Sequence, residues 1–208
     1  MTTILQINTS LNGSSALSSR LASAFVDTMR NGRTAAAGND TALPTVLVRD
    51  LAVDQVPHLT AERFGAFATP ATDRTPDQAR AVALSDELIA ELTRADVVVI
   101  GLPMYNFGIP STLKAYFDHV ARAGVTFRYT ANGPEGLLTG KKAYVFATRG
   151  GAYAGTPADL QTAYVRQFLG FIGIRDVEFI YAEGLAMGDE HRSRALAGVE
   201  ASIDRLAA

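Results

Sequence analysis

A hydroxyl-rich segment at residues 9–19 has the side chains needed to bind a phosphate. It follows a short apolar run, residues 4–8, and precedes apolar residues at helical spacing. Its polar side chains are those of Thr9, Ser10, Asn12, Ser14, Ser15, Ser18 and Ser19. Hydroxyl groups beside the unpaired N–H groups of a helix N-terminus favour a bound phosphate. The alternative is that these side chains only cap the helix.

The same segment lacks the glycine patterns of the common nucleotide-binding loops. It contains neither G-x-G-x-x-G, typical of dinucleotide sites, nor G-x-x-x-x-G-K-[ST], typical of P-loop hydrolases. It also has no lysine that would reach the outer phosphates of a triphosphate. The segment therefore favours a single terminal monophosphate.

A second segment, "PMYNFGIP" at residues 103–110, is unusually apolar for a connection between a strand and a helix. Met104, Tyr105 and Phe107 are suited to packing against a flat aromatic ligand. The Asn106 amide and backbone N–H groups would address the polar edge of such a ligand. The alternative is that the segment packs into the core, although a buried loop must satisfy all its backbone groups.

A third segment, "TRGG", ends another apolar run and consists of Thr148, Arg149, Gly150 and Gly151. Paired glycines let a backbone approach a ligand closely, but they also occur in ordinary turns. Together the three segments predict a ligand with a phosphate, a flat ring and a hydrogen-bonding ring edge. This is the shape of FMN.

Other reactive side chains give weaker signals. His58, His119 and His191 are scattered without metal-ligand spacing, so we expect no metal site. The chain has no cysteine, which excludes disulfides, iron–sulfur clusters and thiol catalysis. Lys114 and Asp118 are spaced as a solvated pair on a helix. We expect no side chain to act as a catalytic nucleophile.

The elements that position these segments follow from the hydrophobic pattern, which predicts five strands alternating with five helices. The strands are expected at residues 4–8, 46–51, 96–103, 142–151 and 177–182. The helices are expected after residue 19, from Pro76 behind a Thr75 cap, at 111–123, at 157–171 and at the C-terminal end. We expect a surface loop at residues 31–44, an irregular excursion at 52–75 and an aromatic connection at 124–140.

Alternating strands and helices predict an α/β fold with a parallel sheet covered by helices on both faces. With five strands the economical order is 2-1-3-4-5, the flavodoxin-like three-layer sandwich. The three segments all follow strands, so they would meet at one edge, where the strand order reverses. Ligands bind at such a switch point.

Length and charge narrow the class of protein. The 208 residues fit one domain spanning 1–208. A net charge of −2 provides no basic surface for nucleic acid. No apolar run is long enough for a membrane span, and the N-terminus does not read as a signal peptide. We therefore expect a cytoplasmic protein.

The sequence resembles the bacterial FMN-dependent NADH-azoreductase/quinone reductase family within the flavodoxin-like superfamily. The resemblance is densest at "LSDELIAEL" (84–92), "PMYNF" (103–107), "LKAYFDHVARAGVTFRYT" (113–130), "NGPEGLLTGKKA" (132–143), "TRGG" (148–151) and "FLGFIGI" (168–174). It implies a homodimer with FMN at each active site, near the subunit interface. It also implies NADH, or sometimes NADPH, as the electron donor.

The resemblance also implies roles for individual residues. Ser10 and the segment Ala16, Leu17 and Ser18 would hold the FMN phosphate. Residues 104–107 would line the ring and ribityl chain, and residues 148–151 the pyrimidine edge. Ala16 departs from the family pattern, where a serine is common, so Ser14 or Ser15 would replace one phosphate contact. The loop at 31–44 is also longer than the pattern.

Four aromatic residues are candidates for a roof over the substrate, contributed by this chain or its partner: Phe127, Tyr129, Phe168 and Phe171. For Phe168 and Phe171 the alternative is core or dimer packing. The expected activity is ping-pong reduction of quinones, by two electrons, and of azo compounds, which are cleaved to amines. Two other functions stay open: an electron carrier without a substrate pocket, and a binding module without flavin.

Overall fold

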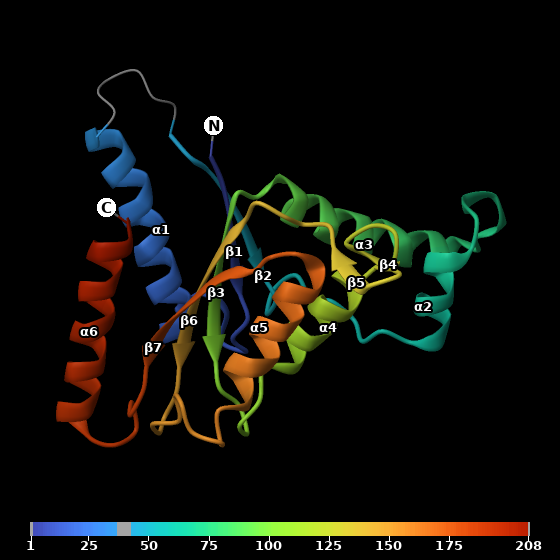
Figure 1. The fold of residues 1–208 in the computed structure, drawn as a ribbon. Helices are drawn as coiled ribbons and strands as arrows, with labels where there is room; N and C mark the ends of the chain where they lie inside the picture. Colours follow the sequence, from blue (N-terminus) through green and yellow to red (C-terminus); the bar gives the residue numbers. More distant parts are fainter. Residues whose placement is uncertain (1, 37–42, 208) are drawn as a thin grey trace.

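A computed structural model describes residues 2–36 and 43–207, and it contains a five-stranded parallel sheet (Figure 1). The strands are β1 (Thr3–Asn8), β2 (Thr45–Asp50), β3 (Val97–Pro103), β6 (Lys142–Thr148) and β7 (Asp176–Ala182). Their order is β2-β1-β3-β6-β7. Numbered among themselves, the sheet strands have the predicted order 2-1-3-4-5, which confirms the flavodoxin-like fold.

Helices cover both faces of the sheet, as Figure 1 shows. One face carries α1 (Leu17–Ala36) and α6 (Asp189–Ala207); the other carries α3 (Pro76–Arg94), α4 (Ser111–Val120) and α5 (Leu160–Ile172). Because strand side chains alternate between faces, Ile4 and Val99 pack with α1 while Leu5 and Val98 pack with α3 and α4. Burial on both faces explains the continuous apolar character of β3.

The start of α3 was predicted correctly. Thr75 Oγ1 accepts a hydrogen bond from Gln78 N at 3.2 Å, and Thr75 N donates to Gln78 Oε1 at 3.0 Å. Pro76 occupies the first helical position. This capping box satisfies two N–H groups at the helix N-terminus.

The prediction of an irregular excursion at 52–75 was wrong, because this region contains α2 (Ala61–Ala68) and a short 3-10 helix, Ala71–Asp73. Thr60 caps α2 by accepting from Arg63 N at 3.3 Å. Phe67 packs edge-on against the ring of His119 and beneath the Arg122 guanidinium. The helix is only eight residues long and lies among prolines, and so short a helix is not stable on its own, so tertiary packing rather than pattern defines it.

Two further connections differ from expectation. The surface loop expected at 31–44 is helical through Ala36, because α1 continues through its alanines; residues 37–42 lie outside the described part of the chain. Within 124–140, β4 (Phe127–Thr130) and β5 (Gly133–Gly136) form an antiparallel hairpin, with Arg128 Nε donating to Glu135 Oε2 at 2.7 Å.

Several predicted bounds also shift at their ends. β6 stops at Thr148 instead of 151, α4 stops at Val120 instead of 123, and α5 begins at Leu160 instead of 157. Within the described ranges, we find no helix that combines the length and the apolar content needed to cross a bilayer.

Candidate cofactor site

The loops after β1, β3 and β6 meet at one edge of the sheet, the lower edge in Figure 1. Ser10 Oγ lies 2.9 Å from the Tyr105 hydroxyl, which joins the first loop to the second. Met104 N donates to Thr148 O at 3.0 Å, which joins the second to the third. The predicted convergence of the three segments is therefore confirmed.

The helix that follows the first loop begins with two buried hydroxyl groups. The side chains of Ser18 and Ser19 are almost fully buried, and within the described residues neither hydroxyl has a hydrogen-bond partner. Both lie in the first turn of α1, where backbone N–H groups lack intrahelical acceptors. A buried hydroxyl left unpaired is unfavourable, so this turn has the chemistry of an anion site.

Ala16 is the residue that opens α1 to a ligand. Its backbone is extended, with φ −64° and ψ 147°, and its carbonyl accepts the first helical hydrogen bond, from Arg20 N at 2.9 Å. Ala16 thus occupies the N-cap position, where serine or threonine would usually accept from the N–H groups that follow. An alanine has no side-chain acceptor for these N–H groups.

Gly101 lets the N-terminus of α1 lie directly against the sheet. A Cβ atom at this position would be 2.9 Å from both the carbonyl carbon and oxygen of Ser18. Thr9 Oγ1 also donates to Gly101 O at 2.7 Å. Strand β3, at the centre of the sheet, and the first turn of α1 are therefore in direct contact.

The second loop is a tight turn with an unusual backbone. Tyr105 and Gly108 exchange hydrogen bonds of 3.1 and 3.0 Å between their backbone groups. The two residues between them, Asn106 and Phe107, have positive φ values of 51° and 65°. This pattern matches a type I′ turn, which favours Asn first and Gly second. A phenylalanine in the second position is strained, and such strain clusters at ligand sites.

The third loop is fixed through its backbone. The carbonyls of Arg149, Gly150 and Gly151 accept from Leu185, Ala186 and Gly184, at 3.2, 2.9 and 2.9 Å respectively. A Cβ atom on Gly151 would come within 2.8 Å of the Tyr153 ring, so a larger residue would require this ring to move. This segment can present backbone groups to a ring edge.

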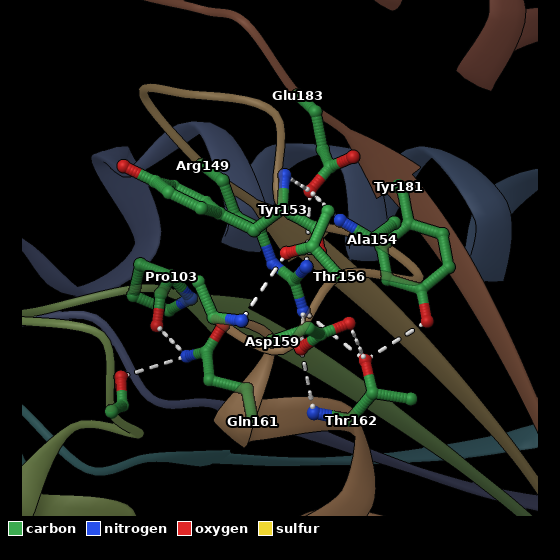
Figure 2. Close-up of polar contacts among 12 residues, drawn as sticks. Pro103, Arg149, Tyr153, Ala154, Thr156, Asp159, Gln161, Thr162, Tyr181 and Glu183 are labelled. Carbon is green, nitrogen blue, oxygen red and sulfur yellow. Dashed lines mark hydrogen bonds and ion pairs between the residues drawn. The ribbon is translucent and has the colours of Figure 1, made fainter.

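The side chain of Arg149 lies outside the ring edge that residues 148–151 are expected to line. Its guanidinium is fully buried and points away into an ion cluster (Figure 2). It contacts Asp159 at 2.7 Å and Glu183 at 3.0 Å. Burial would raise the pKa of Asp159, but hydrogen bonds from Arg149 and Thr162 outweigh it, so the pKa lies below its usual value. The backbone of Arg149 is paired as well, since its N–H donates to Ala182 O at 2.9 Å and its carbonyl accepts from Leu185 N.

A shallow apolar hollow of about 470 Å³ adjoins the second loop. Its lining residues include Phe107, Leu160, Tyr164 and Lys114. The Phe107 side chain is 54% exposed and meets the Tyr153 ring edge-on at 5.8 Å. At its rim, Lys114 Nζ lies 2.5 Å from an Asp118 oxygen, which confirms the predicted pair. This surface offers apolar contact to a flat molecule.

The four aromatic candidates for a substrate roof lie on α5 and the β4–β5 hairpin, and not among the three loops. Phe168 stacks on Phe117 at 3.9 Å, and Phe171 packs against Phe127 at 4.3 Å. Phe127 is buried, whereas Tyr129 is 76% exposed. The structure thus joins Phe127, Tyr129 and Phe171 in one aromatic group, of which Tyr129 is the exposed member, and places Phe168 in a separate stack with Phe117.

Among the described residues, the remaining histidine and acidic side chains provide no metal site. His119, on α4, is buried beneath Phe67 of α2 and next to Ser85 of α3, and burial lowers its pKa. Within the described residues, no group of three histidine, aspartate or glutamate side chains has the geometry of a metal site.

Sequence reasoning missed four residues that shape the site: Gly101, Asp159, Gln161 and Glu183. Each acts through a partner distant in the chain, such as Gln161 on Pro103, 58 positions away. Composition and periodicity contain no signal for such pairs. The one available signal was Gly101 itself, because a glycine inside an apolar run often marks a close approach of another backbone.

The chain has extensive similarity to known proteins. Residues 2–206 match the protein family described as having a flavodoxin-like fold. The chain is 55% identical over 203 residues to FMN-dependent NADH:quinone oxidoreductase 6 of Burkholderia lata, covering 98% of each protein. An azoreductase from Bacillus anthracis superposes with a TM-score of 0.86 at 30% identity, covering 100% of this chain and 99% of that one. An FMN-dependent NADH-azoreductase from Bacillus anthracis, solved in complex with FMN, superposes with a TM-score of 0.84 at 27% identity, covering 100% of both chains.

Proposed function

We propose that this chain, which belongs to the flavodoxin-like family containing the FMN-dependent NADH:quinone oxidoreductases, is itself an FMN-dependent NADH oxidoreductase. Its acceptors are quinones, reduced by two electrons, and azo compounds, cleaved to aromatic amines. Donor and acceptor use the same place in turn, by a ping-pong mechanism. The names of the relative from Burkholderia lata and of the azoreductase from Bacillus anthracis support this assignment.

The observation that carries the proposal is the pair of buried, unpartnered hydroxyls of Ser18 and Ser19 at the N-terminus of α1. They lie at the sheet edge where the apolar loop and the glycine loop meet. A phosphate bound there would accept from Ser18 and from the N–H groups that Ala16 leaves uncapped. Ser10, in contact with Tyr105, would complete this end of the site.

The other two loops would hold the ring system. Residues Met104 to Phe107 would line the ring and the ribityl chain, with the Asn106 amide available for a polar atom of the ring. The backbone of Thr148 to Gly151 would line the pyrimidine edge and stabilise negative charge that develops there. FMN, when bound, supplies reversible two-electron redox chemistry. The protein contributes binding, orientation and electrostatics.

The overall reactions balance without a catalytic nucleophile. NADH and one proton convert a quinone to its hydroquinone and release NAD⁺. Cleavage of an azo bond consumes two molecules of NADH and two protons, and yields two amines. The apolar hollow beside Phe107 offers a stacking surface that suits NADH and either class of acceptor.

We further propose that the protein acts as a homodimer with the active site near the subunit interface. Exposed apolar side chains border the site, among them those of Phe107 and Leu160, which are 54% and 61% exposed. The four predicted roof residues, Phe127, Tyr129, Phe168 and Phe171, lie on α5 and β4, outside the three loops of their own chain. In a dimer they would roof the substrate face of the partner.

Steady-state NADH oxidation by the FMN-loaded protein tests the proposal, with menadione and methyl red as acceptors. The expected result is turnover with both acceptors, and parallel lines in double-reciprocal plots when both substrates are varied. FMN binding without turnover of either acceptor would instead identify an electron carrier. Failure to bind FMN would leave a binding module that uses this fold without flavin.

A further inference from the structure

We infer that the first turn of α5 is a positioning element that fixes the two ring-edge loops relative to each other. This inference rests on the proposed function and concerns Asp159, Gln161 and Thr162. Gln161 holds the apolar loop at residues 103–108, and Arg149 holds the glycine loop at residues 148–154. Figure 2 shows both sets of contacts around the same helical turn.

Gln161 binds both ends of the apolar loop. Its side chain is fully buried, and Nε2 donates to Pro103 O at 2.9 Å and to Gly108 O at 2.8 Å. One amide nitrogen therefore joins the end of β3 to the closing residue of the tight turn. A side chain without two N–H donors would leave at least one buried carbonyl without this partner.

The turn that Gln161 closes needs such external support. Asn106 and Phe107 are both held at positive φ, a conformation that is unfavourable for a phenylalanine. Strained residues keep their conformation only where the surroundings over-determine it. The two hydrogen bonds from Gln161 provide this restraint from outside the loop.

Arg149 binds the glycine loop to the same helical turn. Its Nη2 donates to Asp159 Oδ1 at 2.7 Å and to Thr162 Oγ1 at 3.2 Å. Asp159 is also the N-cap of α5 and accepts from Thr162 N at 3.1 Å. The guanidinium is thus tied to the backbone of α5 through a carboxylate that is itself fixed.

A second carboxylate, that of Glu183, connects Arg149 to the segment that follows Gly150 and Gly151. Glu183 Oε1 accepts from Arg149 Nη1 at 3.0 Å and from the backbone N–H groups of Tyr153 and Ala154 at 2.8 and 2.9 Å. The Arg149 guanidinium also lies over the Tyr181 ring, 5.0 Å from its centre. Residues 149–154 are therefore held on α5 and on the end of β7 together.

The two anchors act on adjacent sides of the proposed ring site. Both loops are hydrogen-bonded to the same helix, α5. Met104 N also joins them directly by donating to Thr148 O. These residues are positioning residues, because the ring would contact the loops and not α5. Their role is to set the loop separation before the cofactor binds, which lowers the ordering cost of binding.

Gln161→Leu tests the inference, with Ser85→Ala as the matched control. Leucine keeps the approximate size and removes the two donated hydrogen bonds. Ser85 donates a buried hydrogen bond of 2.6 Å to His119 O, away from the three loops. FMN affinity is measured by quenching of FMN fluorescence, and thermal unfolding of the ligand-free protein is measured alongside it.

The expected result is that Gln161→Leu weakens FMN binding about tenfold, as loss of the two hydrogen bonds would allow. Ser85→Ala lowers the unfolding midpoint and leaves FMN affinity unchanged. In the ligand-free protein, hydrogen exchange at the amides of Tyr105 and Gly108 becomes faster in Gln161→Leu only. A purely structural role would lower the midpoint of Gln161→Leu without changing FMN affinity or these exchange rates, and would overturn the inference.

Asp159→Asn provides a second test, which can be carried out even if the Gln161→Leu variant does not fold. Asparagine is as good an N-cap as aspartate, so the helix start is kept while the charge facing Arg149 is removed. The expected result is weaker FMN binding and faster exchange at the amides of 149–154. Unchanged values in this variant would contradict the inference. If the unaltered protein does not bind FMN, the proposed function fails. If Gln161→Leu and Asp159→Asn still speed up exchange in the two loops, the first turn of α5 holds these loops as a structural element only.

Discussion

The Oγ atom of Ser10 lies 2.9 Å from the hydroxyl of Tyr105, and the hydroxyl also accepts from Leu11 N at 3.3 Å. These contacts join two loops that are 95 positions apart in the sequence. They place a residue of the apolar loop inside the phosphate end of the proposed site. Tyr105 thereby connects the part of the site that would bind the phosphate to the part that would bind the ring.

Tyr105→Phe is expected to weaken FMN binding by roughly three- to tenfold, the effect of one lost hydrogen bond. The phenol orients Ser10 and Leu11, so its removal loosens the phosphate end. Fluorescence titration with FMN measures the change. Tyr144→Phe, on the α1 side of the sheet, is the control and should bind FMN as the unaltered protein does. Equal affinity in both variants would show that the Tyr105 hydroxyl has no part in binding.

Ser18→Ala is expected to weaken FMN binding by roughly tenfold or more while leaving the ligand-free protein as stable or more stable. The reason is that the Ser18 hydroxyl is buried and has no partner within the described residues. Removal of an unpaired buried hydroxyl relieves an unfavourable contact in the ligand-free state. Urea unfolding and FMN titration together measure both effects. A clear loss of stability in the ligand-free variant would contradict the assignment of this hydroxyl to a ligand.

Phe107→Gly is expected to stabilise the ligand-free protein by about 1 kcal/mol, because glycine adopts positive φ without strain. Little burial is lost, since the side chain is 54% exposed. The same change should raise KM for menadione, because a stacking surface disappears. Urea unfolding and steady-state kinetics check the two effects. A destabilised variant with unchanged KM would show that Phe107 serves packing.

Stability is expected to fall as the pH drops below the ordinary histidine pKa of 6.5, in part through His119. Burial lowers the pKa of His119, and nearby Arg63 adds to this, while the carbonyl of Ala115 and the charge of Asp118 oppose it. The folded state therefore binds the proton less readily than the unfolded state. The contribution is complete above pH 6.5 and is lost as the pH falls toward the lowered value.

His119→Gln tests this pH dependence through thermal midpoints measured from pH 7.5 down to 5.5, the range in which histidine titrates (about 6.5 in peptides). Glutamine retains an N–H group for the Ala115 carbonyl, which lies 3.0 Å from Nδ1 in the native protein. The midpoint should fall less steeply in the variant. The same slope in both proteins would assign the effect to other groups.

The sheet order and the three loops were accessible from sequence because they depend on local features. Continuous apolar runs identify strands buried on both faces, and each unusual loop directly follows such a run. In contrast, α2 is a helix of only eight residues, and the packing of its Phe67 on His119 cannot be inferred from spacing. The β4–β5 hairpin was missed for a similar reason, since Pro134 and two glycines obscure its strand pattern.

Side-chain partners were the least accessible feature. The sequence placed Arg149 beside the ring edge, yet its guanidinium is turned toward Asp159 and Glu183. The predicted loss of a phosphate contact at Ala16 stays a prediction. The structure adds that the Ala16 carbonyl accepts the first hydrogen bond of α1, from Arg20 N, a role that the residue type alone does not specify. Such outcomes depend on distances between remote residues, which residue types and spacing do not specify.

One anaerobic experiment tests the central claim most directly. The purified protein is loaded with FMN, mixed with one equivalent of NADH, and then mixed with menadione, while the visible absorbance of oxidised flavin is followed. The expected result is rapid bleaching of the bound flavin by NADH and full recovery of its absorbance on addition of menadione. Bound flavin that NADH does not bleach, or that menadione does not reoxidise, would contradict the proposed NADH:quinone oxidoreductase activity.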